Sequence, residues 1–186
     1  MTKKLFALAL GLALAGGAVA DSAMKFDAHL EGFTLAGAPV DTNATGNARV
    51  EVLDGGTALH FRVNVAGIDN LLMAHIHVAP IGSPTPVALT DPAGPVAFWI
   101  VADFPPGDTL SDTVNGRLAE GFIITKSDLS DWNDPNDPNS STIEGLIGAI
   151  VDGRASVIVH TSDGNPDTME PVAGDSPAGE LRGTLQ

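Results

Sequence analysis

The sequence predicts a mainly β protein, built as a sandwich or barrel of many short strands. The first observation is composition: the chain of 186 residues contains 21 glycines and 13 prolines, and short apolar runs lie between such turn-forming residues. The second is alternation, because several runs place apolar and polar residues in turn, which is the period of a half-buried strand. No domain boundary or internal repeat is visible, so residues 21–186 are expected to form one domain.

The alternation is clearest in two early runs. Within 26–31 every second residue from Phe26 onward is apolar and is expected to face inward. The same holds within 58–65 from Leu59 onward, and the Asp-Gly-Gly-Thr sequence at 54–57 is typical of a hairpin turn. The strands expected from such runs are, in order, 26–31, 47–53, 58–65, 71–78, 96–101, 118–125, 155–161 and 179–185.

One stretch that departs from the β pattern is 126–132. It is expected to form a helical turn, with Ser127 or Ser130 as its N-cap. The loop 133–139 follows, and its repeated Asn-Asp-Pro is typical of turns. Oxygen ligands are dense enough there to suggest calcium, but the glycine and distal glutamate of an EF-hand loop are absent, so an acidic turn is favoured.

A second stretch, 141–152, predicts a short helix. Its apolar residues fall at helical spacing, and Ser141 or Ser140 is expected to cap its start while Gly153 ends it. The apolar residues concerned are Ile143, Leu146, Ile147 and Ile150.

Residues 1–20 have the features of a cleavable secretory signal. Lys3 and Lys4 are followed by an apolar run, and Ala18-Val19-Ala20 supplies the small residues at which a signal peptidase cuts. The apolar run is short for a membrane span. The mature protein is therefore expected to begin near Asp21, to be periplasmic or secreted, and to have no membrane insertion after processing.

Charge and cysteine content exclude several functions. The formal net charge is -14, which argues against binding to nucleic acid or to an anionic membrane surface. There are no cysteines, so disulfides and thiolate chemistry are ruled out. The sequence also lacks a nucleophile elbow, a phosphate-binding glycine loop and a zinc-protease motif, so no catalytic residue is assigned.

The residues that point to chemistry are histidines. His75 and His77 lie two apart in an expected strand, so their imidazoles project from the same face and can bind one metal ion. His160, at the end of another expected strand, is the natural third ligand if the two strand ends meet. Met73 or Met169 could add a soft sulfur ligand, and copper, with zinc as the alternative, is the ion favoured by such donors.

A second interpretation gives the same histidines a structural role. They would then hydrogen-bond to backbone carbonyls at a sheet edge and hold a loop. His29 and His60 lie on polar sides of their strands and are expected at the surface, with a fourth-ligand role as the less favoured alternative for His60.

Six short motifs follow one another along the chain and span nearly all of it after residue 20. They are Phe26-Asp27-Ala28-His29-Leu30, Thr45-Gly46-Asn47-Ala48, Ala74-His75-Ile76-His77, Ile124-Thr125-Lys126-Ser127-Asp128-Leu129, Val157-Ile158-Val159-His160-Thr161 and Gly179-Glu180-Leu181-Arg182-Gly183-Thr184-Leu185. In this order they resemble the CHRD domain, the module named after chordin. The resemblance implies a Greek-key β-sandwich or barrel with a short helix before the His160 strand. In chordin the module belongs to an extracellular antagonist of growth factors.

The pair His75 and His77 is also similar to the paired-histidine strand of copper-zinc superoxide dismutases, so a dismutase-like fold is expected. Three functions follow in order of preference. The first is a non-catalytic copper-binding module. The second is a structural or interaction module whose acidic surface recognises an extracytoplasmic protein or a polymer. The enlarged acidic loop 162–178 could either close over a bound ion or be a variable surface loop. The third is a dismutase-like redox enzyme, which needs more ligands than can be placed here.

Overall fold

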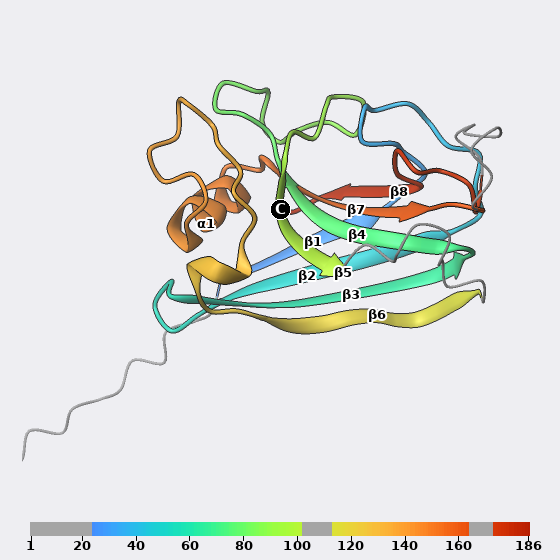
Figure 1. Ribbon diagram of the computed structural model, residues 1–186, viewed down its shortest axis with the longest axis horizontal. Helices are drawn as coiled ribbons and strands as arrows, with labels where there is room; N and C mark the ends of the chain where they lie inside the picture. Colours follow the sequence, from blue (N-terminus) through green and yellow to red (C-terminus); the bar gives the residue numbers. More distant parts are fainter. Residues whose placement is uncertain (1–23, 102–112, 164–172) are drawn as a thin grey trace, which may run out of the picture.

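The computed structural model describes residues 24–101, 113–163 and 173–186 (Figure 1). The expected export signal at 1–20 and the expected ligand Met169 lie outside these residues. Within the described part of the chain, no helix is long and apolar enough to cross a membrane.

Among the described residues, eight strands form two four-stranded antiparallel sheets that pack face to face, as the sequence predicts (Figure 1). The first sheet has the order β1-β2-β3-β6, and the second has the order β5-β4-β7-β8. The strands are β1 (Lys25–Leu30), β2 (Thr45–Leu53), β3 (Ala58–Ile68), β4 (Leu71–Val78), β5 (Val96–Val101), β6 (Val114–Ile123), β7 (Ala155–Thr161) and β8 (Leu181–Thr184).

Five of the expected strands have different bounds. Those expected at 26–31, 47–53 and 58–65 are shifted or extended by one to three residues, as β1, β2 and β3. The strand expected at 118–125 begins earlier, as β6, because it pairs with the full length of β3 across two register shifts. The strand expected at 179–185 is shorter, because only Leu181–Thr184 continues the β7 ladder. β4, β5 and β7 have the expected bounds.

The sandwich is closed along one side by backbone hydrogen bonds between β1 and the end of the chain. Asp27 and Gln186 exchange two such bonds, of 2.9 and 3.0 Å, and Glu31 and Arg182 exchange two more, of 2.9 and 2.8 Å. The chain passes from one sheet to the other between β3 and β4, between β5 and β6, and between β6 and β7. β8 is thereby held beside β7, which carries His160, and β7 in turn pairs with β4, which carries His75 and His77.

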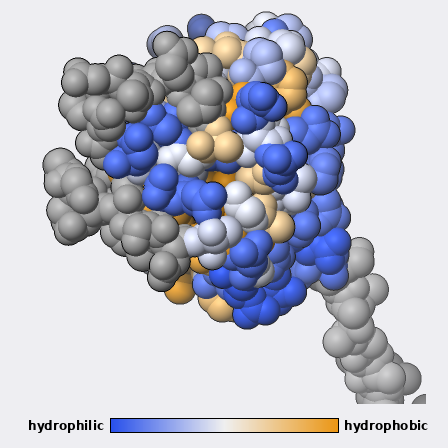
Figure 2. Space-filling model, turned by 90° about the vertical axis from the view of Figure 1, so that its right-hand side faces the viewer, coloured by the Kyte–Doolittle hydropathy of each residue, from blue (hydrophilic) through white to orange (hydrophobic). Residues whose placement is uncertain are grey.

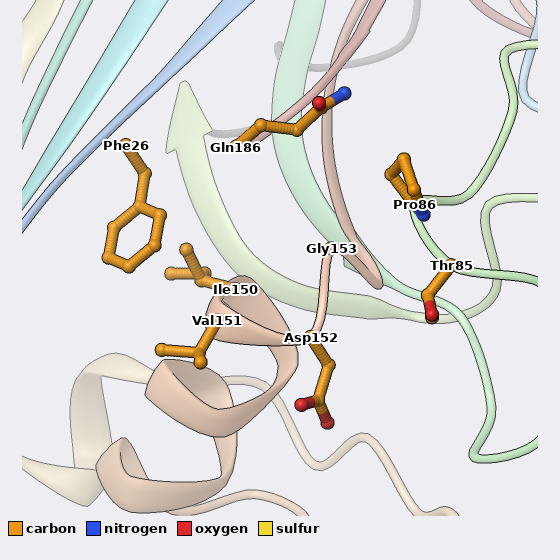
Figure 3. A pocket seen from close by; sticks show the side chains of 8 residues that line it. All are labelled: Phe26, Thr85, Pro86, Ile150, Val151, Asp152, Gly153 and Gln186. Carbon is orange, nitrogen blue, oxygen red and sulfur yellow. The ribbon is translucent and has the colours of Figure 1, made fainter.

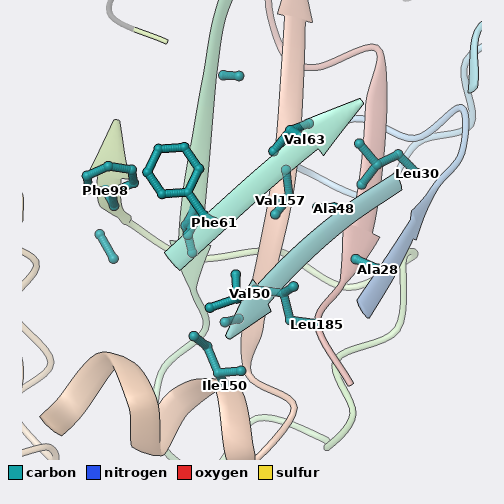
Figure 4. Close-up of a cluster of buried hydrophobic side chains, with 14 of the residues drawn as sticks. Ala28, Leu30, Ala48, Val50, Phe61, Val63, Phe98, Ile150, Val157 and Leu185 are labelled. Carbon is teal, nitrogen blue, oxygen red and sulfur yellow. The ribbon is translucent and has the colours of Figure 1, made fainter. Parts of the chain in front are cut away.

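The core lies between the two sheets and follows the predicted alternation. Leu30, Val50 and Phe61 of the first sheet face Val157 of the second, and all four are buried (Figure 4). Burying a side chain of this kind contributes about 1.5–3 kcal/mol. The α-helix covers one end of the core through residues such as Ile150.

The first helical element, η1 (Lys126–Asp128), is a single 3₁₀ turn, shorter than the predicted 126–132. It ends early because Leu129 already has extended backbone angles (φ −91°, ψ 150°). The expected caps Ser127 and Ser130 are wrong. Thr125 is the N-cap, and the Asp128 carboxylate accepts the Thr125 N–H at 2.8 Å.

The α-helix α1 (Ile143–Val151) lies where the sequence predicts one, and Gly153 follows its end with φ 69°. The cap is Thr142, whose hydroxyl accepts a backbone N–H of the first turn at 3.0 Å. The predicted caps Ser141 and Ser140 are wrong. Ser141 has φ 59°, a left-handed conformation that does not fit the extended backbone of an N-cap.

The loop 133–139 uses its acidic residues as turn and loop anchors, in line with the favoured interpretation. The Asp134 carboxylate accepts the Ile81 N–H at 2.7 Å. The Asp137 carboxylate accepts the Asn139 N–H at 2.9 Å and pairs with Arg154 at 3.4 Å. Both aspartates are buried, so these bonds offset the cost of desolvating their charge.

Candidate metal centre

The three histidines predicted as ligands lie together on the outer face of the second sheet. Ala74 and Ile76 belong to the core between the sheets, so His75 and His77 point to the opposite face of β4. In the antiparallel register with β7, Met73 lies opposite His160 and His75 lies opposite Ile158. Opposed residues share a face, which places His160 beside the pair. Lateral pairing of β4 with β7, rather than a meeting of strand ends, brings them together.

Loops cover this outer face and bury the histidines. His75, His77 and His160 are each only 3 % exposed. His77 Nδ1 bonds to the Gly94 carbonyl oxygen at 2.9 Å, and Gly94 belongs to the connection between β4 and β5. His160 Nδ1 bonds to the Pro177 carbonyl oxygen at 2.9 Å, and Pro177 precedes β8. Each loop is thereby fixed to one of the rings.

The three rings are close enough to share one ion. One ring nitrogen from each histidine lies within 4.8 Å of the other two. His75 Nδ1 and His160 Nε2 are 3.2 Å apart, a distance at which they can hydrogen-bond. Two nitrogens that bind one tetrahedral ion at 2.0–2.1 Å lie about 3.3 Å apart. The observed separation therefore also suits two ligands of a single metal ion.

The hydrogen bonds to the loops set the tautomers. A carbonyl oxygen only accepts, so Nδ1 of His77 and of His160 carries the proton and Nε2 keeps its lone pair. Metal-binding histidines usually donate their other ring N–H to a carbonyl or carboxylate in this way. Nε2 of His77 and Nε2 of His75 are buried and have no hydrogen-bond partner among the described residues. The site thus presents buried imidazole nitrogens whose lone pairs are available to a metal ion.

Electrostatics keep the three rings neutral. Burial, together with the neighbouring histidines, lowers the pKa of His75 to about 3. Burial lowers the pKa of His77 to about 4 against the opposing effect of the Gly94 bond, and it also lowers the pKa of His160. Neutral imidazole is the form that binds a metal ion, so no proton has to be removed before binding at neutral pH.

The other predicted ligands have different positions. Met73 is half-buried and lies opposite His160 in the register, which keeps it beside the site, whereas Met169 lies outside the described residues. His60 is in the first sheet, where its Nε2 lies 3.1 Å from the Glu120 carboxylate, so it is not a fourth ligand. His29 is exposed at the surface of the same sheet, as predicted.

Sequence reasoning missed two residues near the site. Trp99 lies opposite His75 in the pairing of β4 with β5, and its ring contacts the His75 ring edge-on with centroids 4.2 Å apart. Arg182 of β8 is fully buried. The sequence gives a signal only for Arg182, because an arginine in an expected strand needs hydrogen-bond or charge partners when it is buried. The position of Trp99 depends on a long-range register that spacing does not reveal.

The described cavities do not provide a competing site. One of them is a shallow hollow of about 360 Å³ beside the end of α1 (Figure 3). Its ionisable side chain is Asp152, which pairs with Arg154 at 3.5 Å. Its lining is Phe26, Thr85, Pro86, Ile150, Val151, Asp152, Gly153 and Gln186. These residues offer no converging set of acids, bases or metal ligands.

Fold and site together define a β-sandwich domain with a buried three-histidine centre that could hold a metal ion. The chain belongs to the CHRD domain family, whose match covers residues 26–168. The match extends from β1 through β7 and includes all three histidines. No curated protein matches the chain.

Gly94 is expected to be essential for the loop that binds His77. Its φ is 85°, and a Cβ there would collide with the Val78 carbonyl. Gly82 is a matched control, with φ 96° and open space around it. Gly82→Ala should lower the free energy of unfolding by about 1–2 kcal/mol, through backbone strain alone. Gly94→Ala should cost about 1–3 kcal/mol more, through overpacking. Urea unfolding measures both, and equal losses would contradict the expectation.

Proposed function

We propose that this domain binds one transition-metal ion, copper, through His75, His77 and His160, and that it does so without catalysis. The observation that carries the proposal is the protonation state and the orientation of the three imidazole rings. They are neutral and buried, and two of them are oriented by backbone carbonyls with Nε2 left as a donor. Copper(II) outcompetes other divalent first-row ions for imidazole nitrogen, and zinc is the alternative ion. Met73 would add a softer donor beside His160.

An extracytoplasmic address belongs to the proposal. It is supported by the charged, apolar and small-residue pattern of residues 1–20. In a chain without cysteine thiolates, imidazole is the strongest side-chain ligand left for copper. Intact mass of the protein from the extracytoplasmic fraction should give an N-terminus at Asp21; a full-length product would contradict export.

The second candidate is a structural or interaction module without metal. One observation favours it: a direct His75–His160 hydrogen bond and the two carbonyl bonds already tie the loops to the sheet. The acidic composition would then serve recognition of an extracytoplasmic protein, and the face in Figure 2 is largely hydrophilic. The third candidate, a dismutase-like enzyme, requires an open metal position for a reactant.

Trp99 offers an optical test of the metal proposal. Its ring contacts His75, whereas Trp132 is buried elsewhere, so Trp132→Phe leaves a single indole beside the site. Copper(II) added to this variant, stripped of metal, should quench most of the emission and saturate at one equivalent, because a bound copper(II) ion quenches an indole at such short range. Zinc(II), which is not paramagnetic, serves as the comparison.

The same titration has two controls. A Trp99→Phe protein, which keeps Trp132, should lose most of the quenching. In the Trp132→Phe background, His77→Gln should abolish saturable quenching. Quenching that survives loss of His77 would mean that copper binds elsewhere on the acidic surface, and the proposal would fail.

A further inference from the structure

Arg182 is a buried cation whose hydrogen bonds are incomplete. Its relative exposure is 0 %, although arginine is rarely buried without a partner. Nη1 donates to backbone carbonyls, to Leu89 at 3.0 Å, to Leu35 at 3.5 Å and to Asp91. Nε and Nη2 are buried and have no hydrogen-bond partner among the described residues. Leaving such donors unsatisfied in the interior costs about 1–3 kcal/mol, and more when the group is charged.

The guanidinium belongs to the same face as the histidines. Arg182 lies opposite Ile158 on β7, and Ile158 lies opposite His75 on β4, so the three form one row across the second sheet. Neighbouring strands are about 4.8 Å apart, so the ends of this row are about 10 Å apart at the backbone. A long arginine side chain can cover most of that distance above Ile158.

One loop contacts both groups. The Gly94 carbonyl accepts from His77, and the Asp91 and Leu89 carbonyls accept from Arg182. The covering segment is therefore fixed at one point to the ligand set and at two points to the guanidinium. Arg182 remains protonated under all ordinary conditions, so its positive charge stays in this covered space.

We infer that the metal-loaded centre binds a small anion, which takes an open coordination position of the ion and accepts hydrogen bonds from Arg182. This rests on the proposed function, because the ion supplies the first contact. Three imidazoles fill three positions of a four-coordinate ion, and the anion would take the fourth in place of Met73. The two unpartnered guanidinium N–H groups supply the second contact, and charge-assisted bonds of this kind are the strong ones. Bicarbonate and azide have the size and charge to reach both.

The test is a titration of the copper(II)-loaded protein with azide, followed by the azide-to-copper charge-transfer absorption. Arg182→Lys keeps the positive charge and a donor for the loop carbonyls but loses Nε and Nη2. Its azide dissociation constant should rise at least about tenfold. Copper affinity should change less than about threefold, because Arg182 is not a copper ligand. Bicarbonate should displace azide from the wild-type protein.

The possible results separate failure of the metal site from failure of the anion site. If copper does not bind, the proposed function fails and this inference fails with it. If copper binds at the histidines but azide gives no band, or binds equally to Arg182→Lys, the inference alone is overturned. If circular dichroism shows that Arg182→Lys does not fold, a competition experiment on the wild-type protein takes its place. Azide should then resist displacement by neutral ammonia at concentrations where bicarbonate displaces it, and equal displacement would overturn the inference.

Discussion

Copper(II) should raise the melting temperature of the metal-stripped protein by about 8–16 °C when the free ion is at a thousand times its dissociation constant. An ion that binds only the folded state adds about 4 kcal/mol at that ratio. For a chain of this size each kcal/mol corresponds to about 2–4 °C. The physical reason is that the unfolded chain does not hold His75, His77 and His160 within reach of one another. Differential scanning calorimetry with copper or with a chelator measures the shift.

Variants separate the metal site from a merely structural one. His77→Gln removes the ring and its bond to Gly94, so it should lower the melting temperature of the stripped protein under either interpretation. Only the metal interpretation predicts that copper raises the melting temperature of the wild-type protein and does not raise that of His77→Gln. His29→Gln and His60→Gln, both in the first sheet, should keep the full copper shift. A copper shift that His77→Gln leaves intact would contradict the assignment.

Acid should destabilise the stripped protein steeply between pH 6.5 and about pH 4. In the unfolded chain a histidine takes up a proton below its ordinary pKa of 6.5, whereas the folded-state pKa is about 3 for His75 and about 4 for His77. In this window the unfolded state binds more protons, so the free energy of unfolding falls as pH falls. The slope is about 1.4 kcal/mol per pH unit for each ring, or about 2.7 for the two together.

Over two pH units the free energy of unfolding should fall by about 5 kcal/mol, which is comparable with the whole stability of an ordinary domain, about 5–15 kcal/mol. Aspartates whose pKa is lowered, such as Asp27 and Asp134, lose their contribution only as pH falls below about 3.8, so they act in a separate window. Urea unfolding at pH 7, 6 and 5 in chelator measures the slope. His77→Gln should reduce it by about 1.4 kcal/mol per pH unit, whereas Gly82→Ala should leave it unchanged. Equal slopes in wild type and His77→Gln would contradict the buried neutral site.

Local patterns predicted most of the fold, because strand alternation is a local property. The hairpin at 54–57 follows from its turn residues, and the inward residues of β1 and β3 follow from a period of two. Both predictions are confirmed. The caps were mispredicted because several serines and threonines near each helix start offer the same side-chain chemistry. Backbone angles decide between them, as the left-handed Ser141 shows.

The candidate site was predictable only in part. That His75 and His77 share a face follows from their spacing, and their position on the outer face of β4 confirms it. The pairing of β4 with β7 joins segments that are far apart in the chain, so spacing alone could not show that His160 lies beside the pair, as the register does. Trp99 and Arg182 were missed for the same reason, because long-range strand pairing brings both to this face. The burial of the face could not be foreseen either, because it results from loops that fold back over the sheet.

Isothermal titration of copper into the stripped protein tests the central claim most directly. The account predicts one ion per chain with a dissociation constant below about 10 µM. Binding should be lost in His77→Gln and in His160→Gln and retained in His29→Gln. Absence of binding in this range, or binding that all three variants retain, would contradict a metal centre at His75, His77 and His160.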